Sequence, residues 1–312
     1  MKSSVVRGIL RRFFFVPYIN MIYGALYFFR RNIRVAKSND TVDFILSRRC
    51  SVSRYGDGEM NMIIQLLTDN KSVVSPTFQQ YDKRLAERLL EIISAENYDN
   101  ARHIVCIPLW FRGYVGLYKP EVCYLCKKYF VLNHRYILRV LNRRRQYFNA
   151  NITRFYMSYV DKAGCEAFVA RLKKIWDGRS VCVVEGVYSR LGVGNDLFAN
   201  AADLKRILCP AHNAFSRYDE ILHCIVENIP TNTLVLIALG HTATVLAYDL
   251  SLKGFQAIDL GHIDVEYEWM LMGATDKAPL RNKSVNEVGI NNVFAKDCAD
   301  SVYQSQILAE VV

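Results

Sequence analysis

Hydrophobic runs alternate regularly with longer helical stretches from residue 180 to about residue 260. Four short apolar runs are typical of buried strands, at residues 181–184, 206–208, 234–239 and 255–258. Two stretches between the later runs have the length and pattern of helices, residues 214–228 and 242–252. Strands that alternate with helices in this way predict an α/β fold with a Rossmann-like, mostly parallel sheet and helices on both faces.

The first half of the chain continues this pattern less regularly. We expect helices at residues 40–46, 81–94 and across most of 121–176, and strands at residues 50–53, 103–109 and 155–160. Ser38 or Asn39 would cap the first of these helices. Polar and aromatic residues after Pro108 then fall at the carboxyl end of a strand, where ligands gather in open parallel sheets.

Residues 13–29 are uncharged and rich in aromatic side chains, and pairs of arginines flank them. The stretch is near the lower limit of a membrane span, about 20 apolar residues, and Pro17 weakens it. No small-residue cleavage site follows, which disfavours a secretory signal. The pattern fits an interfacial helix on an anionic membrane and, equally, a helix packed on the following domain. We therefore divide the chain into an N-terminal basic and aromatic segment, residues 1–36, and a domain of residues 37–312.

Charge and cysteine usage narrow the classes of protein. The 312 residues are 51% hydrophobic and carry a net charge of +10. Residues 1–34 hold seven of the 40 basic residues and no acid, so the remainder is close to neutral at +3. A nearly neutral body argues against nucleic-acid binding. Nine cysteines without a disulfide-like spacing suit a reducing cytoplasm.

The hexad Arg54-Tyr-Gly-Asp-Gly-Glu59 carries the most distinctive chemistry. It follows a strand and precedes a helical stretch that begins at Met60, so we expect a tight loop in which the carboxylates of Asp57 and Glu59 turn to the same side. Two such oxygen ligands suit a hard cation such as Mn²⁺ or Mg²⁺. A solvated turn with two surface acids is the alternative.

Three further polar loops follow predicted strands. Residues 185–198 contain a glycine-rich turn, and residues 240–244 join a strand to a helix whose N-terminal N–H groups suit phosphate, although Thr242 and Thr244 would equally serve as helix caps. Residues 259–268 crowd acids and a histidine after the last clear strand. We expect Asp264, or else His262, to be the general base that deprotonates an acceptor hydroxyl.

These motifs, together with residues 206–215, resemble in order those of the GT-D-fold glycosyltransferases, bacterial enzymes with a metal-binding Asp-x-Glu motif. The resemblance covers residues 40 to about 275, with one departure, because the family pattern implies proline where His241 stands. It implies a GT-D-type fold, Asp57 and Glu59 as metal ligands, and a UDP-sugar donor. It also implies donor contacts from residues of these motifs: Arg54, Gly56, Glu185, Arg190, Asn195, Asp196, Gly240, Thr242 and Thr244. For Arg54, a salt bridge to Asp57 or Glu59 is the alternative.

The leading hypothesis is therefore a metal-dependent glycosyltransferase of bacterial surface-polysaccharide or protein-glycosylation pathways, with a glycan, glycolipid or glycoprotein as acceptor. It would act in the cytoplasm, at the inner face of the membrane if residues 1–34 make peripheral contact with it. A nucleotide-dependent hydrolase is one alternative, although no Gly-x-x-x-x-Gly-Lys-Ser/Thr loop is present. A noncatalytic, membrane-associated scaffold is the other.

Overall fold

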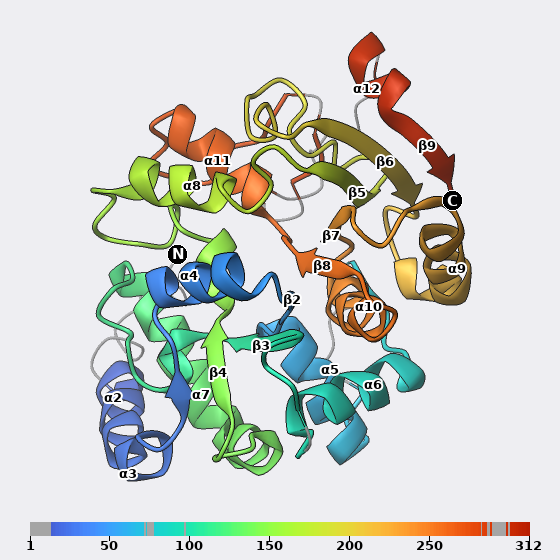
Figure 1. Ribbon diagram of the computed structural model, residues 1–312. Coiled ribbons are helices and arrows are strands. Elements are labelled where there is room, and N and C mark those ends of the chain that lie inside the picture. Colours follow the sequence, from blue (N-terminus) through green and yellow to red (C-terminus); the bar gives the residue numbers. More distant parts are fainter. Residues whose placement is uncertain are drawn as a thin grey trace.

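A computed structural model describes residues 14–71, 73, 78–96, 98–281, 283–285, 288, 298 and 300–312. Within these residues one parallel sheet of nine strands crosses the molecule, in the order β1-β4-β3-β2-β8-β7-β5-β6-β9 (Figure 1). The strands are β1 (Arg34–Val35), β2 (Ser51–Arg54), β3 (His103–Ile107), β4 (Gln146–Asn149), β5 (Ser180–Gly186), β6 (Asp203–Cys209), β7 (Leu234–Ala238), β8 (Gln256–Asp259) and β9 (Ile307–Glu310). The predicted α/β class and parallel sheet are confirmed.

Helices cover both faces of the sheet, and each face has its own hydrophobic core (Figure 1). One core packs α5 (Asp57–Thr68), α6 (Lys83–Ser94), α7 (Pro120–Val140), α9 (Tyr218–Asn228) and α10 (His241–Leu252). The other packs α4 (Ser38–Arg48), α8 (Cys165–Lys173) and α11 (Ile263–Leu271). Because all strands are parallel, their carboxyl ends lie at one edge, and every motif singled out in the sequence reaches that edge.

Short elements complete the fold. The 3-10 turns are η2 (Leu109–Phe111), η3 (Ala150–Thr153) and η4 (Ala214–Arg217), and α12 (Ser301–Gln306) leads into β9. The predicted strand at residues 155–160 is wrong, since only Tyr159 pairs there, in an isolated bridge with Tyr118. The backbone N–H groups of Tyr156 and Met157 donate instead to Glu266 Oε2, at 2.9 and 2.8 Å. The strand in this part of the chain is β4, and its half-polar sequence did not predict a strand.

The predicted cap of the first helix is also wrong. Ser38 is already helical in α4, and the N-cap residue is Lys37, which makes no side-chain cap bond. The Ser38 hydroxyl accepts a hydrogen bond from Asn149 Nδ2 at 2.8 Å instead. The side chain therefore ties α4 to the end of β4, a long-range contact that the local sequence does not encode.

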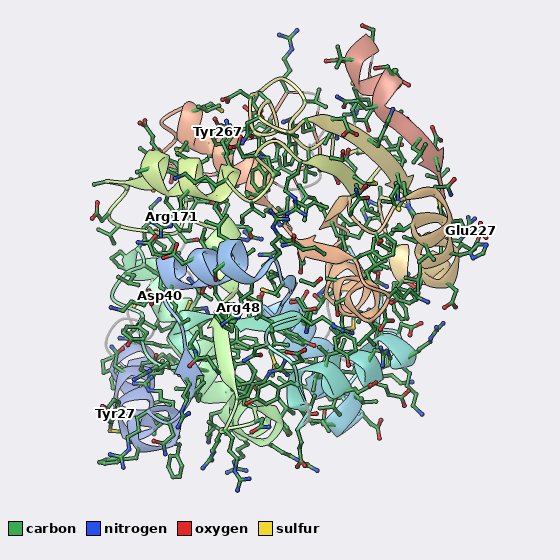
Figure 2. All side chains as sticks on the ribbon, in the orientation of Figure 1. Tyr27, Asp40, Arg48, Arg171, Glu227 and Tyr267 are labelled. Atoms are coloured by element: carbon green, nitrogen blue, oxygen red, sulfur yellow. The ribbon has the colours of Figure 1, made fainter. Side chains whose placement is uncertain are left out.

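The N-terminal segment both packs on the domain and exposes an apolar face. Helix α2 (Val16–Ala25) lies against α7, where Tyr23 is buried and its hydroxyl donates to Trp110 O at 3.1 Å. Arg30 is buried as well, with its guanidinium 3.5 Å from the centre of the Tyr23 ring. On the outer side, Phe28 is 66% exposed, and Tyr27 of α3 (Tyr27–Arg30) lies at the periphery (Figure 2).

The described part of this segment is continuous with the rest of the molecule. Ile33 and Val35 belong to the core on the α7 face, and β1 pairs with β4. The expected boundary at residue 36 therefore does not separate two cores. Residues 1–13, including four of the seven basic residues, lie outside the described residues. Among the helices that the structure describes, none is long and apolar enough to cross a membrane.

Candidate active site

The Asp57 and Glu59 carboxylates stand on the first turn of α5 rather than on an extended loop. The helix begins at Asp57, with Gly56 as its N-cap, and Gly56 N donates to Glu59 Oε2 at 2.7 Å. The expected extended loop is therefore wrong, and the two acids occupy the first and third positions of the helix. Asp57 is exposed, whereas the side chain of Glu59 is only 14% exposed. Both acids still lie at the positive end of the helix dipole.

The first turn of α10 meets the first turn of α5. A Cβ atom added to Gly58 would lie 2.2 Å from His241 Nε2, and that nitrogen is 3.9 Å from Glu59 Oε1. His241 Nδ1 and the hydroxyl of fully buried Thr242 have no hydrogen-bond partner among the described residues. We call Asp57, Glu59, His241 and Thr242 the α5/α10 corner. Its two helix N-termini and two unmatched polar atoms suit an anion.

The α5/α10 corner also suits a metal ion that a ligand helps to hold. Within the described residues, no three His, Cys, Asp or Glu side chains converge into a metal cage. Mg²⁺ bound to nucleotides commonly uses only one or two protein carboxylates, with phosphate and water oxygens as the other ligands. Exposed Asp57 and the Oε1 atom of Glu59 fit that arrangement, since the capping bond takes only Oε2.

Two residues expected to contact phosphate serve the fold around this corner. Gly240 has a φ of +54°, and a Cβ atom there would lie 2.1 Å from Phe78 Cε1, so the ring of Phe78 occupies the space beside it. The Thr244 hydroxyl donates to Arg54 O at 2.9 Å and is fully buried. These contacts fasten α10 to its neighbours. Gly56 contributes its N–H to the α5 cap rather than to a ligand.

Arg54 is engaged by partners inside the fold. Its guanidinium pairs with Asp259 Oδ1 at 2.9 Å, and it also donates to Asp259 O at 2.8 Å and Thr153 Oγ1 at 2.6 Å. Burial raises the pKa of Asp259, and the charge of Arg54 opposes that shift. The alternative of a salt bridge to Asp57 or Glu59 is therefore wrong. Arg54 instead joins β2, β8 and η3.

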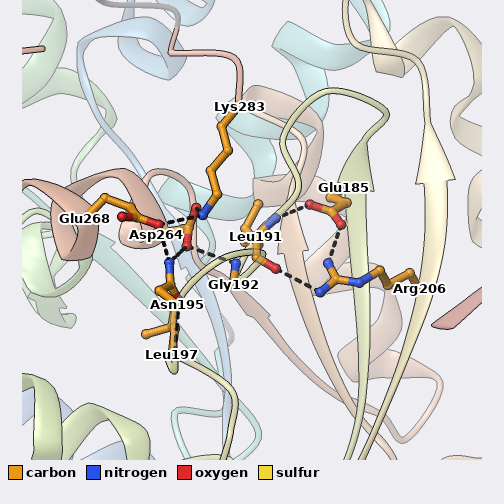
Figure 3. Close-up of polar contacts among 9 residues, drawn as sticks. All are labelled: Glu185, Leu191, Gly192, Asn195, Leu197, Arg206, Asp264, Glu268 and Lys283. Atoms are coloured by element: carbon orange, nitrogen blue, oxygen red, sulfur yellow. Dashed lines mark hydrogen bonds and ion pairs between the residues drawn. The ribbon is translucent and has the colours of Figure 1, made fainter. Parts of the chain in front are cut away.

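A second group of charges is buried and fully paired (Figure 3). Glu185 Oε1 lies 2.5 Å from Arg206 Nη1, and Glu185 Oε2 accepts from Leu191 N at 2.7 Å. Arg206 also donates to Leu191 O at 2.9 Å. Burial raises the pKa of Glu185, against the lowering effect of Arg206. Glu185 therefore holds the turn that follows β5, and its buried carboxylate has no free face for a donor.

Asp264 is the centre of the same arrangement. Its carboxylate accepts from Gly192 N at 2.9 Å, Asn195 Nδ2 at 2.8 Å and Lys283 Nζ at 2.7 Å. Asn195 and Lys283 also reach Glu268 Oε1, at 2.7 and 3.0 Å (Figure 3). We call these residues, with Glu185 and Arg206, the Asp264 cluster. Lys283 was missed in the sequence, where a lone lysine outside every motif gives no signal.

The two candidate bases are both engaged. The side chain of Asp264 is buried, and its oxygens accept hydrogen bonds from three donors. His262 Nδ1 lies 3.0 Å from Arg154 Nη2. Arginine has no acceptor atom, so Nδ1 must accept and Nε2 carries the proton of the neutral ring. The general-base assignment stays a prediction, and this arrangement makes His262 a hydrogen-bond donor.

The remaining candidates of the glycine-rich turn differ in exposure. Arg190 is 3% exposed and has a φ of +49°, so its side chain belongs to the interior rather than to the surface of the edge. Asp196 is more open and accepts hydrogen bonds from Lys173 Nζ at 2.8 Å and Tyr267 OH at 2.6 Å. The hydrogen bonds from Lys173 and Tyr267 lower its pKa. Asp196 is therefore held between α8 and α11.

A hollow of about 640 Å³ lies at the same edge of the sheet, beyond β4 and η3. Phe155, Tyr159 and Phe168 supply aromatic surface, and Asn39 and Asn151 supply amide groups. The helices α4 and α8 border it, and Figure 2 marks Asp40 and Arg171 on them. Aromatic surface with a few amides suits a sugar ring.

Comparison with known proteins adds an independent observation. The family model of the glycosyltransferase GT-D fold matches residues 52–288. The probable glycosyl transferase Gly of Streptococcus gordonii is 36% identical over 282 residues, 90% of this chain. The glycosyltransferase GlyD of Streptococcus pneumoniae serotype 4 is 36% identical over 283 residues, also 90% of this chain. The chain spans only 39% and 33% of the lengths of these two proteins.

Solved structures agree with the sequence matches. A structure described as a highly conserved domain of unknown function with a distinct glycosyltransferase fold is 36% identical, with a TM-score of 0.83. The match covers 93% of this chain and 100% of that one. A structure described as a new glycosyltransferase from Streptococcus sanguinis is 35% identical, with a TM-score of 0.80 over 90% of this chain and 100% of the other.

Proposed function

The chain belongs to the GT-D-fold glycosyltransferase family, and from this membership we propose that it is a metal-dependent glycosyltransferase that uses a nucleotide-diphosphate sugar, with UDP as the nucleotide. The observation that carries the proposal is the α5/α10 corner. There, two helix N-termini meet beside one exposed and one half-buried carboxylate. The N-termini attract an anion, and the carboxylates attract a cation, which is the combination that a metal diphosphate requires.

Each residue of this corner has a proposed part in donor binding. Asp57 and Glu59 would hold Mn²⁺ or Mg²⁺. A divalent cation bound there would neutralise the charge that develops on the departing diphosphate. The buried hydroxyl of Thr242 and the first N–H groups of α10 would donate to phosphate oxygens, which would satisfy a hydroxyl that has no partner among the described residues. His241, whose Nδ1 is also unmatched, would contact the same group.

We place the acceptor on the β4 side of this edge. The hollow that contains Phe155, Tyr159 and Phe168 follows η3, which Arg54 joins directly to β2 and β8. A glycan, glycolipid or glycoprotein could present a sugar there. His262, held by Arg154, would orient a sugar hydroxyl between the hollow and the donor.

The exposed aromatic side of the N-terminal helices supports peripheral attachment to the cytoplasmic face of a membrane. Phe14, Phe15, Tyr18, Met21 and Phe28 are all more than half exposed, while the opposite side of α2 is buried. Aromatic rings and nearby arginines would hold this face at an anionic surface. Sedimentation with anionic vesicles tests this, and a protein that stays in the supernatant at low salt would contradict it.

Release of UDP from a panel of UDP-sugars tests the enzymatic proposal directly. We expect release with Mn²⁺, faster release when a suitable acceptor is added, and none with excess chelator. A hydrolase would release UDP at a rate that no acceptor changes. A noncatalytic scaffold would release none from any donor in the panel, and that result would contradict the proposal.

A further inference from the structure

A strongly basic hollow of about 640 Å³ lies at the opposite edge of the sheet from the candidate active site. Its lining comes from the residues just before β2, β3, β5, β7 and β8, five strands that are neighbours in the sheet. Four cationic side chains line it: Arg49, Arg102, Arg179 and Lys253. Among the residues that the structure describes, no aspartate or glutamate lines it.

The four cations lack the counter-ions that other charges of this protein have. Among the described residues, none of the four forms an ion pair, whereas Arg54, Arg88 and Arg206 all contact carboxylates. Arg179 is half-buried, and its Nη1 donates only to neutral oxygens, Gln256 Oε1 at 2.7 Å and Ile175 O at 3.2 Å. Burial, and then the positive charge of Arg49, lower the pKa of Arg179. Among the described residues, these like charges thus share the hollow without a carboxylate to balance them.

Helix dipoles explain only half of this charge. Arg49 and Lys253 are the C-cap residues of α4 and α10, where a cation is favourable in any protein. Arg102 and Arg179 lie in loops that enter β3 and β5, and neither is the C-cap residue of a helix. Thr231, Asn232 and Ser251 add neutral polar groups to the lining.

We propose that this hollow binds a small anion that bears a diphosphate group, at a site separate from the donor site. Guanidinium groups match phosphate oxygens in pairs, and several cations suit a multiply charged group better than a single carboxylate. The volume lies within the range of about 300 to 1,000 Å³ typical of small-molecule sites. The diphosphate could belong to free pyrophosphate or to a nucleoside diphosphate.

Calorimetry with inorganic pyrophosphate, in the presence of chelator, tests the proposal on the full chain. The test variant is Arg102→Gln with Lys253→Gln, which changes two exposed side chains. The control is Arg143→Gln with Arg144→Gln, which removes the same charge from two exposed arginines outside the hollow. We expect the test variant to bind pyrophosphate about tenfold or more weakly than wild type. The control should bind it as wild type does.

Parallel titrations separate the sources of the ligand. A larger loss in the test variant with UDP than with pyrophosphate would assign the site to nucleotides, and an equal loss would assign it to the diphosphate alone. If sulfate binds the wild type as tightly as pyrophosphate does at the same ionic strength, the hollow attracts anions in general and the proposal is overturned. The proposal is also overturned if the control variant loses as much pyrophosphate affinity as the test variant. The readout is binding, so it stands even if the protein transfers no sugar.

Discussion

Two groups of charged side chains at the carboxyl edge of the sheet differ in how completely the protein satisfies them. In the Asp264 cluster, Glu185, Arg206, Asp264 and Lys283 are buried, and each has protein partners within hydrogen-bond distance. In the α5/α10 corner, Asp57 is exposed, and Thr242 has an unmatched hydroxyl. Buried charges require partners wherever they lie. The complete pairing of the cluster therefore assigns it to the structural framework, and the incomplete pairing of the corner supports our proposal that a ligand binds there.

Removing Glu185 should have the largest effect, and the effect should be on stability. Glu185→Ala leaves buried Arg206 without its carboxylate, and breaking a buried pair in this way costs about 3–5 kcal/mol. Chemical denaturation measures the loss in the free energy of unfolding. Glu220→Ala is the control, because Glu220 pairs with Arg217 at an exposed position and should leave the unfolding transition nearly unchanged. Equal stability of Glu185→Ala and wild type would contradict the framework role.

Removing the charge of Asp57 should have the opposite effect, with a large loss of activity and little loss of stability. Asp57→Asn should lower metal-dependent transfer on the order of 100-fold, because in our proposal this carboxylate would help to hold the metal ion beside the departing diphosphate. Its free energy of unfolding should fall by only about 0.3–0.5 kcal/mol, because among the described residues the exposed carboxylate makes no hydrogen bond or ion pair and interacts only with the dipole of α5. Steady-state kinetics at saturating donor and metal measure the rate.

Glu59→Gln tests whether the two acids of the α5/α10 corner differ in their effect on stability. Glu59 caps α5 through Gly56 N, so this variant should lose transfer as Asp57→Asn does and should also lose some stability, roughly 1 kcal/mol or less. Wild-type rates in both variants would remove the metal site from the α5/α10 corner.

Acid should weaken the attachment of α10 through His103. The ring Nε2 lies 2.8 Å from the Ser53 hydroxyl, which donates to Thr244 O at 2.5 Å. Burial, and secondarily the charge of Arg145, lower the pKa of His103 to about 3. The unfolded chain takes up this proton near pH 6.5, so the stability is fully present above that pH. It is lost as pH falls from about 6.5 toward 3.

The expected slope for this one group is about 1.4 kcal/mol per pH unit. Denaturation of wild type and His103→Gln between pH 7 and pH 5 measures it, and the variant should lack this part of the pH dependence. An identical slope in both proteins would show that His103 does not cause the acid sensitivity.

Much of the fold follows from local patterns. The strands β5, β6, β7 and β8 lie where apolar runs of the second half predicted them. β5 and β6 extend beyond the predicted bounds, β7 is one residue shorter, and β8 is shifted by one residue. Hydrophobic periodicity succeeds there because buried parallel strands and the helices that cover them require it. Hydrophobic periodicity did not predict β4, because its sequence Gln-Tyr-Phe-Asn is half polar. It did not predict β1 either, because two residues are too few to show a pattern. Such strands depend on their neighbours in the sheet.

The sequence by itself determined which residues reach the carboxyl edge, since a motif that follows a parallel strand must lie there. Only the tertiary structure decided what each of them does. Arg54 selected Asp259, 205 residues away, and Asp264 selected Lys283, which belongs to no motif. Partners of this kind depend on how distant segments pack, and a buried charge takes whichever counter-ion the packing brings within reach. The same packing left Asp57 exposed and Thr242 unmatched.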